Sequence, residues 1–391
     1  MNPKVSIIMP CLNEEKFISR AIESLITLSS MESISSELKE DEVNPFREGA
    51  FEKKVVHDDY FLENCELIIV DGGSTDRTCE VVREYIDGPK SQELGINGKV
   101  RLLNNPGRVQ SQGLNAGIKE AKGEIICRAD AHCIFPLGYV KRCVELLEAT
   151  GAANVGGMMV PVANGPYRDL EPGHTYQSGV SGGCFRRLGQ VIISRALRHP
   201  LGAGDAKWRL GRYAGFVDTV YLGTFRREIF DEVGLYDANL KTNEDAELNL
   251  RILKAGKRIY LDSSIQVQYF PRETLKKLAK QYFNYGQGRC YTTLKHKKFT
   301  SLRQVAPLAV VAGLLVSIMG AVFERWLLIF PLIYAVGLTG IAFLSRERGN
   351  IKSEGRCSSI SFLVKLGMAA AWAIIHVSWG LGFWKYLILR K

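Results

Sequence analysis

The 391-residue sequence contains no C-x-x-C pair and no G-x-x-x-x-G-K-[ST] motif, and no G-x-G-x-x-G follows its first strand-like segment. Its nine cysteines are scattered singly, which disfavours a disulfide framework or a zinc site and predicts reduced packing residues. The missing glycine motifs argue against a dinucleotide site and a Walker-type triphosphate site. The first residues also lack a charged segment followed by an apolar one, so no signal peptide is expected.

Acidic residues are scarce in the last third of the chain. Residues 272–391 contain 18 Lys and Arg but 4 Asp and Glu, whereas residues 1–271 contain 33 and 37, so the net charge of +10 comes from the C-terminal part. The same part holds the apolar runs, so its basic residues indicate the flanks of membrane segments rather than a nucleic-acid surface. We therefore expect membrane lipids as partners and no nucleic acid.

Long uncharged runs are confined to this C-terminal part. Val305–Phe323 and Trp326–Leu344 have 19 residues each and are separated by Glu324-Arg325. Each run is long enough to cross a hydrocarbon core of ~30 Å as a helix. The alternative is a buried core helix of a soluble domain, which we disfavour because no polar face interrupts either run. The pattern predicts a tight transmembrane hairpin over residues 305–344. A third membrane segment over residues 362–391, with its apolar stretch at Met368–Trp384, either spans the bilayer or lies in its interface.

Basic residues flank the hairpin on both sides. They lie in a juxtamembrane linker over residues 291–304 and in a loop over residues 345–361. Because Lys and Arg flanks remain on the cytoplasmic side, we expect a multi-pass protein of the cytoplasmic membrane with a cytoplasmic N-terminal domain.

Strand-like and helix-like segments alternate over residues 1–290. Short apolar runs are separated by helical patterns, which predicts an α/β domain with a largely parallel sheet. Residues 29–64 interrupt this rhythm with 10 acidic and 4 basic residues, and we interpret them as an acidic surface insertion. The expected strands are Val5–Met9, Leu67–Val70, Val100–Leu103 and Ile125–Cys127, and the expected helices are Lys16–Leu28, Thr75–Tyr85, Val109–Ala121 and Pro136–Glu148.

Each of these four strands is followed by polar or turn-forming residues. Ligands bind at the carboxyl ends of the strands in open α/β sheets, so four such ends predict one site. Asp71 ends an apolar strand, where its carboxylate can accept hydrogen bonds from a nucleoside. Asp130 and His132 are two apart and point the same way in an extended chain, and together they suit Mn²⁺ or Mg²⁺.

Two downstream motifs are less specific by themselves. Residues 242–251 place acidic side chains before a helical apolar pattern, which is typical of a helix N-terminus. Residues 281–289 combine aromatic, glycine and basic residues, which is typical of an amphipathic helix at a lipid surface.

The order of the motifs is more specific than any one of them. Seven segments follow one another in this order: VSIIMPCLNEE, ELIIVDGGSTDRT, NNPGRVQSQGLNAGI, GEIICRADAH, VYLGTFRREIFDEVGLYD, NEDAELNLRIL and QYFNYGQGR. Together they resemble glycosyltransferase family 2 with the GT-A fold, a Rossmann-like nucleotide-sugar domain. The resemblance is greater to the membrane-bound glucosyltransferases of bacterial succinoglycan synthesis, and it covers about residues 4–290 and continues into the C-terminal spans.

The resemblance implies a role for several residues. Asp130 and His132 match the family's D-x-D position, where an acidic residue contacts the metal on the diphosphate, and the histidine departs from that pattern. Asp245 matches the second residue of the E-D pair, the catalytic base. Arg289 lies where related enzymes place a C-terminal motif near the diphosphate and acceptor. Together with Asp130 and Arg289, the implied donor-binding residues are Pro10, Asn13, Glu14, Asp71 and Arg108.

These implications predict an inverting, metal-dependent hexosyltransferase. It would move a sugar from a nucleotide-diphosphate sugar, in the first place a UDP-sugar, to a lipid-linked or growing polysaccharide acceptor of an exopolysaccharide or cell-surface glycan. No Q-x-x-R-W motif is present, which argues against a processive, cellulose-type polymerase. The alternatives are a polyprenyl-phosphate glycosyltransferase, a catalytically silent membrane scaffold and a nucleotidyltransferase of similar fold. A scaffold does not need Asp130 and Asp245, and a nucleotidyltransferase does not need a transmembrane hairpin.

Overall fold

The computed structural model describes residues 3–27, 58–163, 181–204, 206–211, 213–299, 304–345 and 358–389, with only the backbone at 181–187 and 358–360. Most of the expected acidic insertion, residues 29–57, lies outside these ranges. Two compact units are present. The first comprises Met1–Met159, Arg212–Asn239 and Asp245–Gln268, and the second comprises Val160–Gly211, Leu240–Glu244 and Tyr269–Lys391.

The first unit is built on a nine-stranded sheet of order β3-β2-β1-β4-β8-β6-β9-β5, with β7 paired to β9. The four predicted strands are confirmed and lie parallel to one another, as β1 (Val5–Cys11), β2 (Cys65–Asp71), β3 (Val100–Asn104) and β4 (Ile125–Arg128). The described pairings of β8 with β4 and β6, and of β7 with β9, are antiparallel, so the sheet is mixed. The remaining strands are β5 (Cys133–Ile134), β6 (Asn154–Pro161), β7 (Ala214–Val217), β8 (Tyr221–Arg226) and β9 (Ile259–Tyr269).

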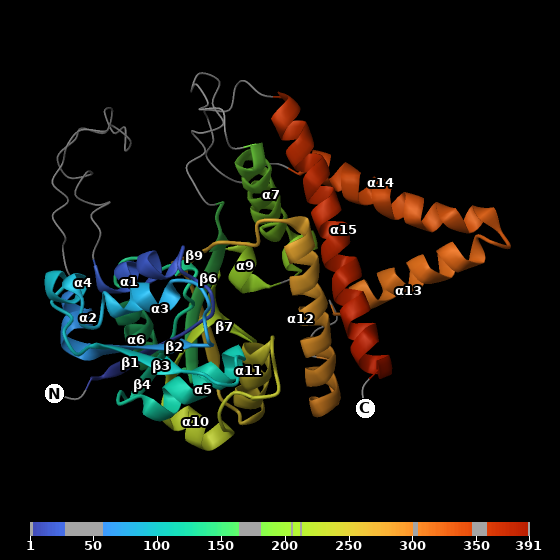
Figure 1. The fold of residues 1–391 in the computed structure, drawn as a ribbon. Helices are drawn as coiled ribbons and strands as arrows, with labels where there is room; N and C mark the ends of the chain where they lie inside the picture. The colour runs from blue at the N-terminus through green and yellow to red at the C-terminus, as the bar shows by residue number, and fades with distance from the viewer. Residues whose placement is uncertain are drawn as a thin grey trace. The chain divides into compact units, whose positions relative to one another are not determined.

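The four predicted helices of this unit are confirmed, the first three with shorter bounds and the fourth shifted towards the C-terminus (Figure 1). They are α1 (Ile18–Ile26), α3 (Thr78–Arg83), α5 (Gln110–Glu120) and α6 (Tyr139–Thr150). Gly117 allows α5 to lie directly on β1, since a Cβ there would be 2.4 Å from Ile8 Cγ2. The other helices are α2 (Asp59–Asn64), α4 (Pro89–Glu93), α10 (Glu228–Val233) and α11 (Glu244–Lys254).

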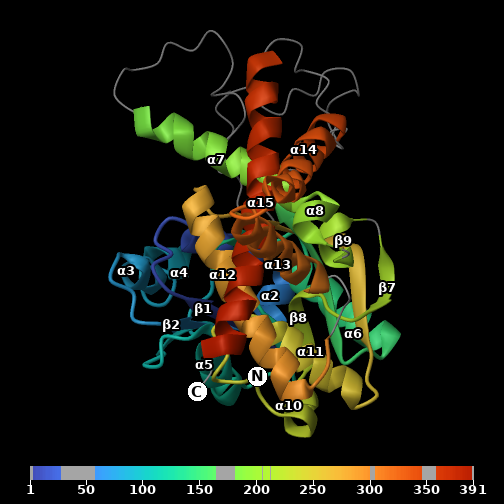
Figure 2. The ribbon, with the colours of Figure 1, turned by 90° about the vertical axis from the view of Figure 1, so that its right-hand side faces the viewer.

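The second unit is helical and is organised around one long helix. Figures 1 and 2 both show α12 (Leu275–His296) beside α15 (Ser358–Leu389). Trp372 of α15 is fully buried, and its Nε1 donates a hydrogen bond to the Ala196 carbonyl at 3.0 Å. The other elements are α7 (Ser181–Leu197), α8 (Pro200–Ala203), α9 (Lys207–Leu210), α13 (Val305–Gly320), the 3-10 helix η3 (Arg325–Leu328) and α14 (Ile329–Leu344).

The apolar C-terminal runs form helices, but these helices do not pack as a tight hairpin. Arg325–Leu344 and Ser361–Leu389 are each long and apolar enough to cross a membrane, whereas α13 is shorter, with 16 residues. Figure 1 shows α13 and α14 joined at η3 and diverging towards α15, and each packs more on α15 than on the other. The third apolar stretch lies within the single continuous helix α15.

Candidate active site

The carboxyl ends of β1 to β4 lie at one edge of the sheet of the first unit, because the four strands are parallel. The loops that follow them are joined by side-chain hydrogen bonds. Asn13 has a left-handed backbone (φ 58°), which asparagine tolerates better than most residues. Its Oδ1 accepts a hydrogen bond from the Thr75 N–H at 2.8 Å, and its N–H donates to Ser74 Oγ at 2.8 Å. The loops after β1 and β2 are therefore held together as one surface.

Asp71 shapes the loop that it begins. The Gly73 N–H donates to its Oδ2 at 2.9 Å, and the Ser74 hydroxyl donates to its Oδ1 at 2.5 Å. The residue is only 7% exposed. A nucleoside contact of Asp71, which the sequence predicts, would have to be made alongside these hydrogen bonds.

Arg108 provides an exposed positive charge next to this loop. Its backbone is left-handed (φ 56°), and its Nη2 donates to the Gly73 carbonyl at 3.5 Å. Gly73 itself has a φ of 82°, and a Cβ on it would lie 3.3 Å from Arg108 Nε. A glycine at 73 therefore allows both the turn and the close approach of the guanidinium.

Arg128, at the end of β4, is the central side chain of the edge. It is 5% exposed, its Nε donates to Asp130 Oδ1 at 3.1 Å, and its Nη1 donates to Asp245 Oδ1 at the start of α11. Gln110 Nε2 also donates to Asp130 Oδ1, at 3.3 Å. One buried guanidinium thus fixes two carboxylates that are 115 positions apart in the sequence.

Arg128 and Gln110 are absent from the sequence prediction of the site. For Arg128 a signal was present, since it precedes Asp130 by two positions and extended residues two apart share a face. For Gln110 the sequence contains no comparable signal, because its contact depends on how α5 packs.

His132 is held by a carboxylate from the loop after β1. The sequence predicts that it faces a cation together with Asp130, and the structure pairs its Nδ1 with Glu14 Oε1 at 3.2 Å. The two side chains are 24% and 19% exposed. When Nδ1 carries the proton and donates to Glu14, Nε2 holds the lone pair that a metal ion needs.

The side chains at this edge that can ligate a metal decide whether a divalent ion fits there. Among the residues that the structure describes, no group of three or more His, Cys, Asp and Glu side chains is placed to hold a metal ion. Carboxylates and an imidazole are nevertheless the ligand types that Mn²⁺ accepts, and Mg²⁺ is commonly held by one or two carboxylates plus substrate phosphates. The edge therefore fits an ion that shares its coordination with a phosphate-bearing ligand.

The thiols at this edge are unsuited to nucleophilic chemistry. Burial, together with the neighbouring Asp71 carboxylate, raises the pKa of Cys11 well above its ordinary value. Burial likewise raises the pKa of Cys133, with Asp130 contributing in the same direction. The reactive form of cysteine is the thiolate, so these two side chains remain protonated packing residues. All seven cysteines described with side chains are free thiols, as the sequence predicts for a reduced domain.

The two remaining predicted site residues, Pro10 and Arg289, lie within a strand and a helix. Pro10 is within β1 and pairs with Val70 of β2. Arg289 lies on α12 of the second unit, where it lines a cavity of that unit.

Comparison with known proteins identifies the class. The profile of Glycosyl transferase family 2 matches residues 52–234. Over 384 residues the chain is 30% identical to a curated relative, with 98% of this chain and 94% of that protein covered. The chain therefore belongs to glycosyltransferase family 2 and is a glycosyltransferase, as the motif order predicts.

The relatives and structural neighbours carry specific names. The 30% identical protein is the Succinoglycan biosynthesis protein ExoA of Rhizobium meliloti (strain 1021). A second relative is 25% identical over 88% of both chains, the dolichyl N-acetyl-alpha-D-glucosaminyl phosphate 3-beta-D-2,3-diacetamido-2,3-dideoxy-beta-D-glucuronosyltransferase of Methanococcus voltae. In fold, the chain is similar to the mannosyltransferase PcManGT from Pyrobaculum calidifontis, solved in complex with GDP-Man and Mn²⁺. The TM-score is 0.56 at 14% identity, covering 100% of this chain and 89% of that chain.

Proposed function

We propose that this chain is an inverting, metal-dependent glycosyltransferase of exopolysaccharide or cell-surface glycan synthesis. In this proposal it uses a nucleotide-diphosphate sugar, preferably a UDP-sugar, and transfers the sugar to a lipid-linked or growing polysaccharide acceptor at the cytoplasmic membrane. The observation that carries the proposal is the Arg128 guanidinium, which joins Asp130 and Asp245 at the carboxyl edge of the sheet. Two carboxylates held by one guanidinium suit one donor-side and one acceptor-side task.

On the donor side, the nucleoside diphosphate is the leaving group. Asn13, Asp71 and Pro10 would line the nucleoside part, and the exposed Arg108 guanidinium would make charge-assisted hydrogen bonds to the diphosphate. By the sequence resemblance, Arg289 would lie near the diphosphate and the acceptor. The structural neighbour PcManGT was solved with a nucleotide sugar, GDP-Man, which supports a donor of this class.

Asp130, with His132 oriented by Glu14, would hold the divalent cation. Such an ion, when bound with the diphosphate, supplies Lewis-acid stabilisation of the negative charge that develops on the leaving group. The Mn²⁺ in the PcManGT complex supports this assignment. Arg128 would keep the Asp130 carboxylate correctly oriented.

Asp245 would act as the general base. It takes the proton of the acceptor hydroxyl while that oxygen attacks the anomeric carbon and the bond from this carbon to the diphosphate oxygen breaks. A single displacement of this kind inverts the anomeric configuration. General-base help of this sort is typically worth about 10²–10⁴-fold in rate.

The acceptor and the membrane location rest on two supports. The names of the two relatives refer to succinoglycan biosynthesis and to a dolichyl-linked sugar acceptor. In addition, the second unit contains two helices that are apolar and long enough to span a bilayer. A membrane-embedded enzyme with cytoplasmic catalytic residues is consistent with both.

The test uses the full-length protein in detergent with a panel of UDP- and GDP-sugars. We expect one donor to release its nucleoside diphosphate, EDTA to abolish this release, and Mn²⁺ or Mg²⁺ to restore it. Full release in EDTA would reject the metal dependence. Release with none of the donors, also when acceptor lipids are added, would favour the scaffold alternative.

The same assay tests the base. Asp245→Asn should retain affinity for the nucleotide and lose about 10²–10⁴-fold in turnover. The matched control is Glu232→Gln, which removes a half-exposed carboxylate paired with Lys257 at 2.8 Å. Near-native turnover of Asp245→Asn would remove this residue from the mechanism. Transfer to polyprenyl phosphate itself, rather than to a lipid-linked saccharide, would identify the polyprenyl-phosphate alternative.

A further inference from the structure

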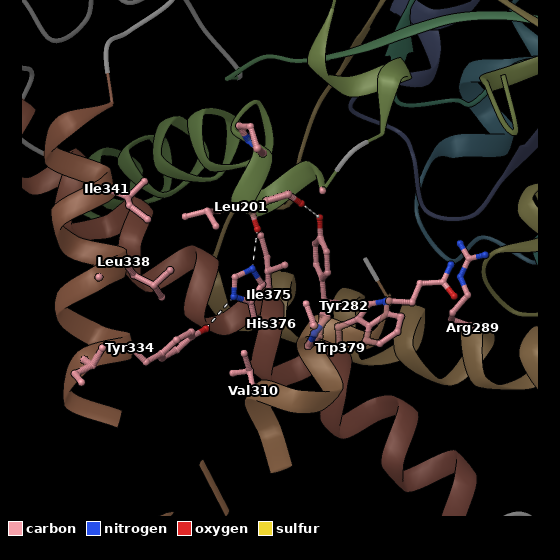
Figure 3. Close-up of a pocket in the computed structure, with 18 residues that line it drawn as sticks. Leu201, Tyr282, Arg289, Val310, Tyr334, Leu338, Ile341, Ile375, His376 and Trp379 are labelled. Atoms are coloured by element: carbon pink, nitrogen blue, oxygen red, sulfur yellow. Dashed lines mark hydrogen bonds between the residues drawn. The ribbon is translucent and has the colours of Figure 1, made fainter. Parts of the chain in front are cut away.

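The second unit encloses a cavity of about 520 Å³ (Figure 3). This volume lies within the range of small-ligand pockets, roughly 300–1,000 Å³. Its walls come from α8, α12, α13, α14 and α15, so it lies where α13 and α14 diverge towards α15. Most lining side chains are apolar, among them Val310, Ile333, Leu338, Ile341 and Ile375.

Two polar side chains of the wall are hydrogen-bonded to each other. Tyr334 of α14 and His376 of α15 are joined by a hydrogen bond of 2.9 Å between the Tyr334 hydroxyl and His376 Nδ1. His376 Nε2 donates to the Leu201 carbonyl of α8 at 2.8 Å, so the tyrosine hydroxyl is the donor in the first bond. Figure 3 shows this chain of hydrogen bonds from Tyr334 through His376 to Leu201. It links three helices around the cavity without directing a charge into it.

The cavity has one charged lining group. Among its described lining residues, Arg289 of α12 is the only Lys, Arg, Asp or Glu. Figure 3 shows Arg289 at one end of the row of lining side chains and Tyr334 at the other, with Tyr282 and Trp379 between them in this view. The cavity thus offers an apolar interior and a single cation displaced to one end.

The surface around the cavity is apolar as well. Val316 and Met319 of α13 are 67% and 70% exposed, and Leu332 and Val336 of α14 are 61% and 62% exposed. Exposed apolar area of this extent requires a lipid or protein cover. An occupant entering between α13 and α14 would therefore come from a hydrocarbon environment.

We propose that this cavity binds the carrier lipid of the acceptor, a polyprenyl phosphate or diphosphate. The apolar chain lies against the walls formed by α13, α14 and α15, and Arg289 contacts the phosphate group. The proposal rests on the lipid-linked acceptor proposed above and adds the place and the chemistry of its lipid part. An arginine is suited to this task because its guanidinium matches the geometry of a phosphate.

Two glycines of α14 allow a matched test. Gly337 lines the cavity and Gly340 does not, and a Cβ at either position would meet no atom within 4 Å. We expect Gly337→Leu to occupy part of the cavity, since its Cβ has free space there, and Gly340→Leu adds the same side chain elsewhere on the same helix. Val310→Phe fills the cavity from α13 and serves as a second variant. Equal melting temperatures of these proteins in detergent confirm that they are folded.

Binding is measured without donor, so that a failure of catalysis does not affect the result. Native mass spectrometry of the full-length chain counts bound C55 polyprenyl phosphate, with diacyl phosphatidic acid and inorganic phosphate as comparison ligands. We expect wild type and Gly340→Leu to bind the polyprenyl phosphate equally, and Gly337→Leu, Val310→Phe and Arg289→Gln to bind it at least about tenfold more weakly. Donor hydrolysis by Gly337→Leu should equal that of wild type.

Three outcomes would overturn the proposal. Undiminished polyprenyl phosphate binding by both cavity-filling variants would show that the lipid binds elsewhere on the protein. Equal binding of phosphatidic acid would show that the cavity binds lipids without preference for a polyprenyl chain. Competition by inorganic phosphate at similar concentration would show that only the head group is bound. If wild type binds the lipid but hydrolyses no donor, the result would instead reject the proposed function alone.

Discussion

At the scale of single residues, the candidate site depends on contacts between side chains of loops that are far apart in the sequence. Polar residues after four parallel strands must meet at one edge, and this is how Asn13 and Asp130 could be placed there. The ion pair of His132 with Glu14 depends instead on side-chain directions in two such loops. Periodicity carries no information about such directions.

Arg128 gives the residue-scale prediction. Arg128→Gln removes the cation shared by Asp130 and Asp245, and leaves a buried carboxylate uncompensated, so we expect a loss of about 3–5 kcal/mol in the free energy of unfolding. Arg142→Gln is the matched control, because Arg142 also contacts two carboxylates, Asp262 and Glu145, but its side chain is 49% exposed. Asp262 is itself buried, but solvent screens the half-exposed Arg142 guanidinium, so we expect Arg142→Gln to lose less stability than Arg128→Gln.

Unfolding of both variants should be followed in detergent together with turnover. Arg128→Lys should recover only part of the stability, since one ammonium cannot reproduce the two directions of the guanidinium. A loss in Arg128→Gln no greater than in the Arg142→Gln control would show that the two carboxylates do not depend on Arg128.

At the scale of helices and strands, short β-branched runs flanked by turns predicted β1 to β4 and the helices between them. The antiparallel half of the sheet was not predicted, because β5 has two residues and long connections separate β6 from β7 and β8 from β9. The packing of α12 on α15 also escaped prediction, since nothing in either segment alone identifies its partner.

Glu66 of β2 connects several elements and should make stability depend on pH. Burial alone would raise its pKa, but hydrogen bonds from the Ser6 hydroxyl at 2.6 Å and the Lys122 N–H at 2.7 Å, with the Arg101 guanidinium at 2.7 Å, lower the pKa below the ordinary 4.5. A lowered folded-state pKa stabilises the fold fully above the unfolded value, and this contribution is lost as the pH falls through the folded value.

The melting temperature of wild type should exceed that of Glu66→Gln most above pH 4.5, and the difference should shrink below it. A difference that stays constant with pH for Glu66→Gln would contradict the argument.

The contact between α12 and α15 gives the second prediction at this scale. A Cβ on Gly286 would lie 2.0 Å from the Trp379 carbonyl oxygen, and one on Gly382 would lie 2.0 Å from the Phe283 carbonyl oxygen. Gly286→Ala and Gly382→Ala must therefore separate the helices, and we expect each to lower stability by about 1–3 kcal/mol in thermal melting. Gly340→Ala should be neutral or slightly stabilising, since alanine favours helix and the added Cβ meets no atom within 4 Å. Equal melting temperatures of all three variants would show that α12 and α15 can separate without loss of stability.

At the scale of the whole chain, the two units are not consecutive stretches of sequence. Residues 160–211 and 269–290 belong to the helical unit, although the motifs around them suggested a single domain over residues 1–290. The reason is that α7 and α12 contribute Ile193 and Leu278 to the same buried cluster as Trp372 of α15. Motif order follows the chain, whereas a hydrophobic core gathers residues regardless of their order.

The last prediction concerns the membrane. Arg325–Leu344 has a mean hydropathy of 2.3 with little of it buried in the protein, and Val322, Phe323 and Leu344 are each more than 80% exposed. If these surfaces lie in hydrocarbon, the full-length chain should stay in the membrane pellet at about 1 M salt, where charges are screened within ~3 Å, because screening does not weaken apolar burial. It should also resist alkaline carbonate and be released by detergent. Release by alkali but not by salt would indicate helices that lie in the interface rather than span the bilayer. Release by salt alone would show that the protein is held by its basic residues, and it would overturn the membrane-spanning assignment of α14 and α15.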